Sequence, residues 1–318
     1  MQDWPANCGP ILLSGDIQER DMIQGILYIV GSSLVFGCLP TSNRYLVLNG
    51  IPPMCVTFYT QGILTLIAAA AARLRGDSLR IDRGSAVKLL LLGAVGMGAT
   101  SFLINSATQS IPVGLATVIH FMYPTVVTVV MMTVFRQKAT WCKLLAVVCS
   151  VSGMLLITNL EGGSVSLLGV LLAASSSLTY SYYMISNEKA GFVSLPLLTR
   201  LFYAGIGSTA VFGVLSALSG NIRVPTKPGM LAVLFLISGA GNFIAHFLIT
   251  KGTKLIGAST ASFVNMLEPV TSVFVSLIVY RDVLRTNMVL GIVLILSSVL
   301  LVALDGKLLE ARQAKHAQ

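Results

Sequence analysis

A single carboxylic acid lies at the centre of a long apolar segment of the chain. Glu268 has eleven residues on either side within the segment 257–279, and most of these neighbours are hydrophobic. An acidic side chain near the middle of a bilayer costs about 2.5–3.5 kcal/mol even on scales derived from insertion experiments. We therefore expect this carboxyl group to be protonated, hydrogen-bonded to another helix, or open to a water-filled cavity.

Polar residues recur at a spacing of three in this segment and in an earlier one, 112–134. Residues three apart share one face of a helix, so each segment carries a polar stripe. The stripes consist of Ser262, Asn265 and Glu268, and of Thr117, His120 and Tyr123. Pro269 and Pro124 directly follow them, and each removes an intrahelical hydrogen bond and permits a kink. We predict that both prolines act as hinges.

Each candidate has two interpretations. Glu268 contacts substrate or couples protons, or it is a protonated cross-link near the backbone carbonyl that Pro269 leaves unpaired. His120 is a site residue or a core histidine, and His246 is interpreted as structural. Ser33, Ser177 and Tyr180 are weaker candidates, because small hydroxyl residues in membrane helices often only allow close packing. We expect no metal or cofactor, since these residues lack metal-ligand spacing.

The elements that position these residues follow from composition. Of 318 residues, 12 are acidic and 21 basic, 55% are hydrophobic, and mean hydropathy is +0.84. A helix that crosses a bilayer needs about 20 apolar residues. The sequence therefore predicts an all-α integral membrane protein with ten transmembrane helices: 22–41, 53–72, 86–107, 112–134, 142–159, 165–186, 196–218, 229–249, 257–279 and 286–304.

The basic residues predict the orientation. With ten spans, both tails lie on one side, and that side receives all but five of the 21 Lys and Arg residues. The positive-inside rule then places both termini in the cytoplasm of a cell membrane protein. This distribution explains the net charge of +9 without binding to nucleic acid. Arg200, four residues into a span, is expected to reach water at the cytoplasmic side.

The chain repeats itself at an offset of 144 to 145 residues. The offset pairs rarer residues as well as apolar ones: Gly25 with Gly169, Ser33 with Ser177, Ser42-Asn43 with Ser186-Asn187, Pro52 with Pro196, Phe58-Tyr59 with Phe202-Tyr203, Ile111 with Ile256, and Pro124 with Pro269. We divide the chain into a tail, 1–21, two five-helix repeats, 22–159 and 160–304, and a second tail, 305–318. Because five is odd, the repeats are predicted to be inverted, an arrangement typical of alternating-access transporters.

Two stretches resemble a known family. Residues 111–157 and 256–302, and above all Ala261-Ser262, Leu267-Glu268-Pro269-Val270 and Gly291, are similar to the duplicated EamA domain of the drug/metabolite transporter superfamily. That family often has an acidic residue after the ninth helix, here Asp282, whereas the first-half counterpart is Gln137. The resemblance implies a ten-helix transporter or exporter of small metabolites, with a central cavity between helices one to four and six to nine.

Taken together, the sequence predicts a secondary transporter, expected to be an exporter, of small metabolites such as amino acids. Its partners would be a small-molecule substrate, protons and the lipid bilayer, and a homodimer is compatible with the sequence. The alternatives are a membrane scaffold, receptor or lipid-handling protein that moves no solute, a channel, and an intramembrane enzyme. An enzyme is disfavoured because the spans lack a convergent nucleophile, base and metal ligands.

Overall fold

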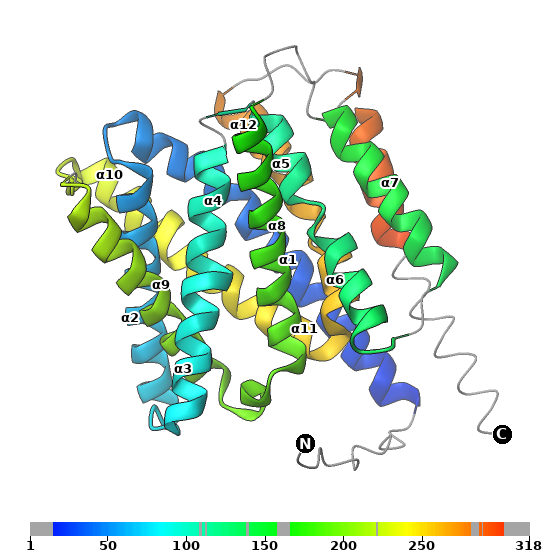
Figure 1. Cartoon of the computed structure of the whole chain (residues 1–318), viewed down its shortest axis with the longest axis horizontal. Coiled ribbons are helices and arrows are strands. Elements are labelled where there is room, and N and C mark those ends of the chain that lie inside the picture. The colour runs from blue at the N-terminus through cyan, green and yellow to red at the C-terminus, as the bar shows by residue number, and fades with distance from the viewer. Residues whose placement is uncertain are drawn as a thin grey trace.

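The computed structural model describes residues 15–107, 110–111, 113–137, 140–157, 166–220, 222–280, 286–287 and 289–301. All regular structure in these ranges is helical (Figure 1). The first half contains α1 (Gly15–Leu48), α2 (Pro53–Arg75), α3 (Arg83–Leu91), η1 (Leu92–Ala99), α4 (Thr100–Ala107), α5 (Val113–His120), α6 (Tyr123–Thr133) and α7 (Trp141–Ile157). The second contains α8 (Leu167–Lys189), η2 (Gly191–Ser194), α9 (Leu197–Leu218), α10 (Pro228–Ala232), η3 (Val233–Gly239), α11 (Ala240–Val264), α12 (Leu267–Tyr280) and an apolar helix, Val289–Leu301.

Five helical stretches are long and apolar enough to cross a membrane. They are Arg20–Leu48, Pro53–Arg75, Arg83–Ile104, Leu197–Leu218 and Pro228–Val264. Shorter apolar helices cover parts of three further expected spans: Tyr123–Thr133, Trp141–Gly153 and Val289–Leu301. The predicted all-helical fold with membrane-length apolar helices is confirmed, whereas the number of ten spans stays a prediction.

The structure moves two expected boundaries. The sequence predicted a gap between spans 229–249 and 257–279, but α11 continues through that gap and bends only at Gly257, whose φ is 77° and ψ 157°. The expected ninth span is instead interrupted at Asn265 and Met266, and the fourth at Phe121 and Met122. A proline cannot bond the carbonyl four residues before it and clashes with it, so each break precedes its proline, Pro124 or Pro269.

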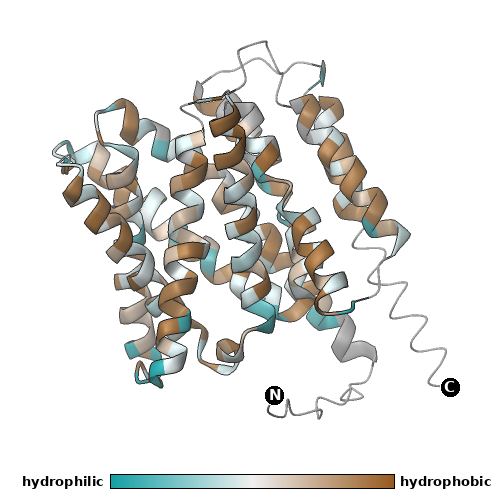
Figure 2. Cartoon of the chain, viewed as in Figure 1, coloured by the Kyte–Doolittle hydropathy of each residue, from teal (hydrophilic) through white to brown (hydrophobic). Residues whose placement is uncertain are grey.

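Apolar side chains cover the outside of the bundle and polar side chains lie within it. On α1, Leu34 is 52% exposed whereas its neighbour Ser33 is fully buried. On α8, Leu178 is 57% exposed and Ser177 is buried. Figure 2 shows hydrophobic residues along most of the helix surfaces. This distribution suits a hydrocarbon environment, in which helices associate through small and hydroxyl residues.

Contacts between the halves are reciprocal at equivalent residues. Gly25 of α1 lies so close to Ile256 of α11 that a Cβ atom would overlap it. Its counterpart Gly169 of α8 also lies too close to Ile111, the counterpart of Ile256, for a Cβ atom to fit. The equivalent hydroxyls of Thr65 on α2 and Thr209 on α9 lie 3.4 Å apart. Such pairing is typical of two repeats related by a two-fold axis that passes near the threonine pair.

Candidate functional site

Asn265, in the break between α11 and α12, is the junction of a buried polar cluster. Ser33 of α1 donates a hydrogen bond to its Oδ1 at 3.1 Å. Its Nδ2 donates to the hydroxyl oxygen of Tyr123 at 3.1 Å and to Oε2 of Glu268 at 3.3 Å. One fully buried amide therefore connects α1, α6 and α12.

Tyr123 links this junction to α8. Its hydroxyl donates to the carbonyl of Ser262 at 3.2 Å, and its ring meets that of Tyr180 edge-on with centroids 4.7 Å apart. Ser181 of α8 donates to the Tyr123 carbonyl at 3.2 Å. The equivalent position on α1 is Gly37, where a Cβ atom would lie 2.9 Å from the Glu268 carbonyl. Equivalent positions of the two halves thus lie close to equivalent carbonyls, with a hydrogen bond from Ser181 in one half and a glycine at that position in the other.

The first-half stripe contacts α8 through His120. Nδ1 of His120 lies 2.9 Å from the hydroxyl of Ser176, not of Ser177. The Ser177 hydroxyl is buried and has no hydrogen-bond partner. Thr117 is partly exposed one turn before His120 on α5. The Ser262 hydroxyl bonds to the Ser259 carbonyl of its own helix, so this residue joins the cluster through its backbone carbonyl.

Glu268 differs from the residues around it in exposure. Its side chain is partly exposed, whereas Asn265, Tyr123 and Ser262 are completely buried. The Asn265 carbonyl, which Pro269 cannot bond, accepts a hydrogen bond from the Glu268 backbone N–H at 2.9 Å. The carboxyl group is therefore not needed to satisfy that carbonyl.

The cluster extends further along α8 than the sequence indicated. Tyr183 stacks on Tyr180 with ring centroids 5.9 Å apart, and its hydroxyl lies 2.9 Å from Nδ1 of His246 and 3.0 Å from Oγ1 of Thr250. Phe36 of α1 meets the His246 ring edge-on at 5.1 Å. The spacing of three between Tyr180 and Tyr183 is the signal that could have found this extension.

Arg200 does not reach water as expected. The side chain is only 3% exposed, and its Nη2 donates to Oδ1 of Asn187 at 2.6 Å. Asn187 in turn donates to the Tyr183 carbonyl at 3.0 Å. The prediction was wrong because Arg200 faces the end of α8 and the η2 turn, where Phe192 lies under its guanidinium at 5.8 Å. The sequence alone does not show how these elements pack around Arg200 and bury it.

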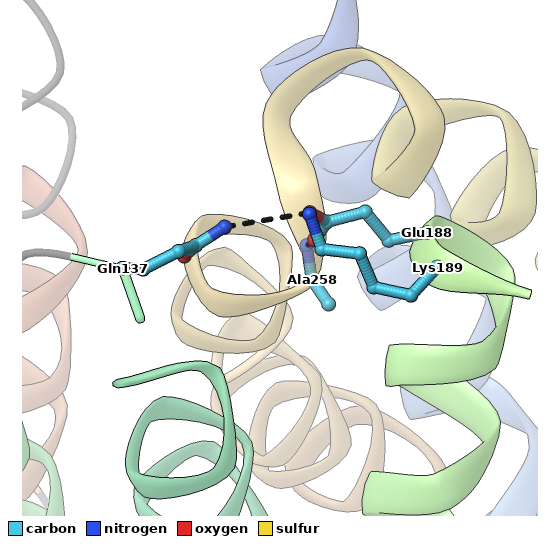
Figure 3. A network of polar contacts seen from close by, with 4 residues as sticks. All are labelled: Gln137, Glu188, Lys189 and Ala258. Carbon is cyan, nitrogen blue, oxygen red and sulfur yellow. Dashed lines mark hydrogen bonds and ion pairs between the residues drawn. The ribbon is translucent and has the colours of Figure 1, made fainter. Parts of the chain in front are cut away.

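A second polar cluster lies at the end of α8 (Figure 3). Glu188 forms an ion pair with Lys189 at 2.7 Å and accepts a hydrogen bond from the backbone N–H of Ala258. Gln137, just after α6, donates to Oε1 of Glu188 at 3.5 Å. Ala258 follows the bend at Gly257, so the carboxylate caps the helical segment that leads to Asn265.

Metal ligation finds no support among the described residues. There, no group of three or more His, Cys, Asp and Glu side chains is placed to hold a metal ion. The cluster can instead exchange hydrogen bonds with a polar solute and hold or release a proton at Glu268.

An all-helical bundle with an apolar exterior, reciprocal halves and a buried polar centre defines a duplicated membrane protein of the transporter class. The sequence pattern of the EamA-like transporter family matches residues 23–159 and 167–304, and the chain belongs to this family. The resemblance noted in the sequence is thereby confirmed.

Individual relatives agree with this assignment. The chain is 24% identical over 298 residues to an uncharacterized inner membrane transporter, YicL, of Salmonella typhimurium, covering 89% of this chain and 96% of that protein. A protein of known crystal structure shares the fold with a TM-score of 0.76 at 17% identity, covering 91% of this chain and 99% of the other. The protein is a multi-pass membrane transporter of the cell membrane.

Proposed function

We propose that this protein is a secondary transporter that exports small metabolites such as amino acids by alternating access. Ten spans in two inverted five-helix repeats, 22–159 and 160–304, would place the polar cluster near the bilayer midplane. The observation that carries the proposal is the cluster itself. Equivalent segments of both halves meet there around Asn265, at helix breaks that precede Pro124 and Pro269.

The proposed substrate site consists of Glu268, Asn265, His120, Tyr123, Ser262, Thr117, Ser33, Ser177 and Tyr180. Amide, hydroxyl and imidazole groups fit neutral or zwitterionic solutes, because each can donate or accept a hydrogen bond without a fixed charge. Glu268 supplies the one ionisable carboxyl group of this set, and we assign proton coupling to it. Pro124 and Pro269 interrupt the two helices that would move, so we assign the hinges to them.

The contacts of Glu188 support a gating role for the second polar cluster, at the end of α8. Glu188 joins the end of α8 to the residues that follow α6 and to the segment after Gly257. Alternating access requires the half-structures to separate on one side while they close on the other. Contacts of Glu188 would hold the bundle closed at its own end, which we assign to the cytoplasmic side.

Counterflow in reconstituted vesicles tests the proposal. Purified protein in liposomes preloaded with a metabolite mixture should exchange a subset of solutes with an isotopically labelled external mixture, as read by mass spectrometry. A pH gradient should drive net movement of the same solutes. If the protein exchanged none of these solutes, the transport function would be contradicted and a scaffold or receptor would be favoured.

A further inference from the structure

Arg200 is a buried cation without a counter-charge among the described residues. No carboxylate there lies within ion-pair distance of its guanidinium, and the ion pair described at the end of α8 joins Glu188 to Lys189. Its Nη2 has one neutral hydrogen-bond partner, Asn187, and its buried Nε has none. A buried charge is costly unless it is paired and fully hydrogen-bonded. Within the described part of the chain, the guanidinium therefore lacks a counter-anion.

The repeat shows that the helix packing does not require this cation. At the offset that aligns Pro52 with Pro196 and Tyr59 with Tyr203, the counterpart of Arg200 is Val56. Val56 is equally buried, at 3% exposure, and purely apolar. The same place in the first repeat is thus filled by an aliphatic residue. Arg200 is an addition to a scaffold that packs without it.

The surroundings of Arg200 connect it to the central cluster. Asn187 bonds both Arg200 and the carbonyl of Tyr183, and the Tyr183 ring stacks on Tyr180. Asn187 lies seven residues beyond Tyr180 on α8, which is about two turns or roughly 10 Å along the helix. The carboxylate and ammonium groups of one amino acid are only two bonds apart. An amino acid whose carboxylate contacted Arg200 would therefore have its α-ammonium group near the same end of α8, displaced from Tyr180.

We propose that Arg200 binds the carboxylate group of the substrate at a second position, displaced from Glu268 toward the end of α8. This inference rests on the proposed transport function. A guanidinium binds a carboxylate through two parallel N–H···O bonds, and the unpartnered Nε and the adjacent Nη2 present that fork. A monoanion would neutralise the single positive charge, whereas a doubly charged phosphate would leave a buried negative charge unpaired. The substrate class is therefore the monocarboxylates, amino acids included.

Ligand-dependent thermal stability of the purified full-length protein tests this position without any transport measurement. The probes are a mixture of amino acids and short organic acids and a matched mixture of their primary amides. We expect the acids, but not the amides, to raise the melting temperature of the wild type and of Arg75→Gln, which removes an exposed arginine at the end of α2. Arg200→Gln should lose the acid-specific rise. An equal rise in Arg200→Gln, or no acid-specific rise in the wild type, would overturn the proposal.

A second variant tests the proposal if Arg200→Gln does not fold. Arg200→Lys keeps the charge but not the fork, so the Kd for the acids should increase by about tenfold. An unchanged Kd would contradict carboxylate binding by the guanidinium.

Vesicle counterflow separates the failure of this inference from the failure of the transport function. If the wild type exchanges only solutes that lack a carboxylate, transport stands and the role of Arg200 is refuted. If the wild type exchanges no solute, the transport function fails, and the thermal experiment still decides whether Arg200 binds carboxylates.

Discussion

One amide, that of Asn265, forms hydrogen bonds with side chains from three helices. It accepts from Ser33 and donates to Tyr123 and Glu268. A buried polar group that loses its partner costs about 1–3 kcal/mol, so the three contacts hold their helices in one arrangement. Glu268 is the member that combines partial exposure with an ionisable group. Its protonation state is thus connected to the geometry of α1, α6 and α12.

The first prediction concerns Glu268→Gln. Glutamine keeps the size of the side chain and a hydrogen-bonding oxygen, but it cannot bind or release a proton. We expect normal folding, retained counterflow exchange, and at least about a tenfold loss of transport driven by a pH gradient, equivalent to about 1.4 kcal/mol. Asp77→Asn, in the connection after α2, is the control. Wild-type rate and pH profile in Glu268→Gln would refute proton coupling.

At the same scale, the sequence predicted contacts within one segment better than contacts between helices. The spacing of three indicated that Asn265 and Glu268 lie close together, and their side chains are hydrogen-bonded, although a helix break at Asn265 and Met266 interrupts the predicted face. The contact of His120 with Ser176 was not predicted, because the rotation of α8 against α5 depends on packing that one sequence does not reveal. The burial of Arg200 was not predicted, for the same reason.

Two element ends determine where the polar centre lies. Breaks before Pro124 and Pro269 end one helix and begin the next, which exposes backbone groups and places Asn265 at a turn. Gly257 supplies the third break, with φ of 77° and ψ of 157°, a conformation essentially restricted to glycine. The prolines could be interpreted from the sequence. The role of Gly257 could not, since the sequence placed this residue at the start of a new span rather than at a bend within one long helix.

The second prediction is that Gly257→Ala destabilises the protein by about 1–3 kcal/mol, because alanine is strained in this backbone conformation. Its Cβ atom would also approach Oε2 of Glu188 to 3.3 Å. Thermal or denaturant unfolding in detergent measures the effect. Gly191→Ala is the matched control, since a Cβ atom there meets nothing within 4 Å. Equal stability of the two variants would exclude strain at Gly257.

The third prediction concerns the closed end formed by Glu188. Glu188→Ala removes the bonds to Ala258, Lys189 and Gln137, and hydrogen bonds to charged groups contribute about 1.5–3 kcal/mol each. We expect a roughly tenfold or larger shift toward the state open at that end. Spin labels at the exposed residues Thr133 and Leu255 should report a broader and longer distance distribution.

Lys189→Gln is the control for this experiment, because it removes the ion pair but leaves the carboxylate bonded to Ala258. Its distance distribution should stay close to that of the wild type. If Glu188→Ala also matched the wild type, Glu188 would be a helix cap without a gating role.

For the whole molecule, the sequence duplication was predictable, but the contacts between the two repeats were not. Rare residues such as Pro52, Pro196 and the paired prolines of the helix breaks revealed the offset. The reciprocal contacts of Gly25 and Gly169, and the meeting of Thr65 with Thr209, depend on how the halves pack. These contacts define equivalent surfaces on the two repeats. They are compatible with a two-fold relation, and five spans per repeat, as predicted, would place its axis in the membrane plane.

The last prediction tests that inversion through equivalent positions. Ser78, after α2, and Ile222, after α9, are 144 residues apart, and both are exposed. Parallel repeats would place them on the same side of the membrane, whereas inverted repeats place them on opposite sides. In a variant without native cysteines, Ile222→Cys should react with a membrane-impermeant thiol reagent in intact cells, and Ser78→Cys should react only after permeabilisation. Ser219→Cys, near Ile222, should react as Ile222→Cys does. Labelling of both equivalent positions from outside would refute inversion, and labelling of Ser78→Cys alone would reverse the predicted orientation while leaving inversion intact.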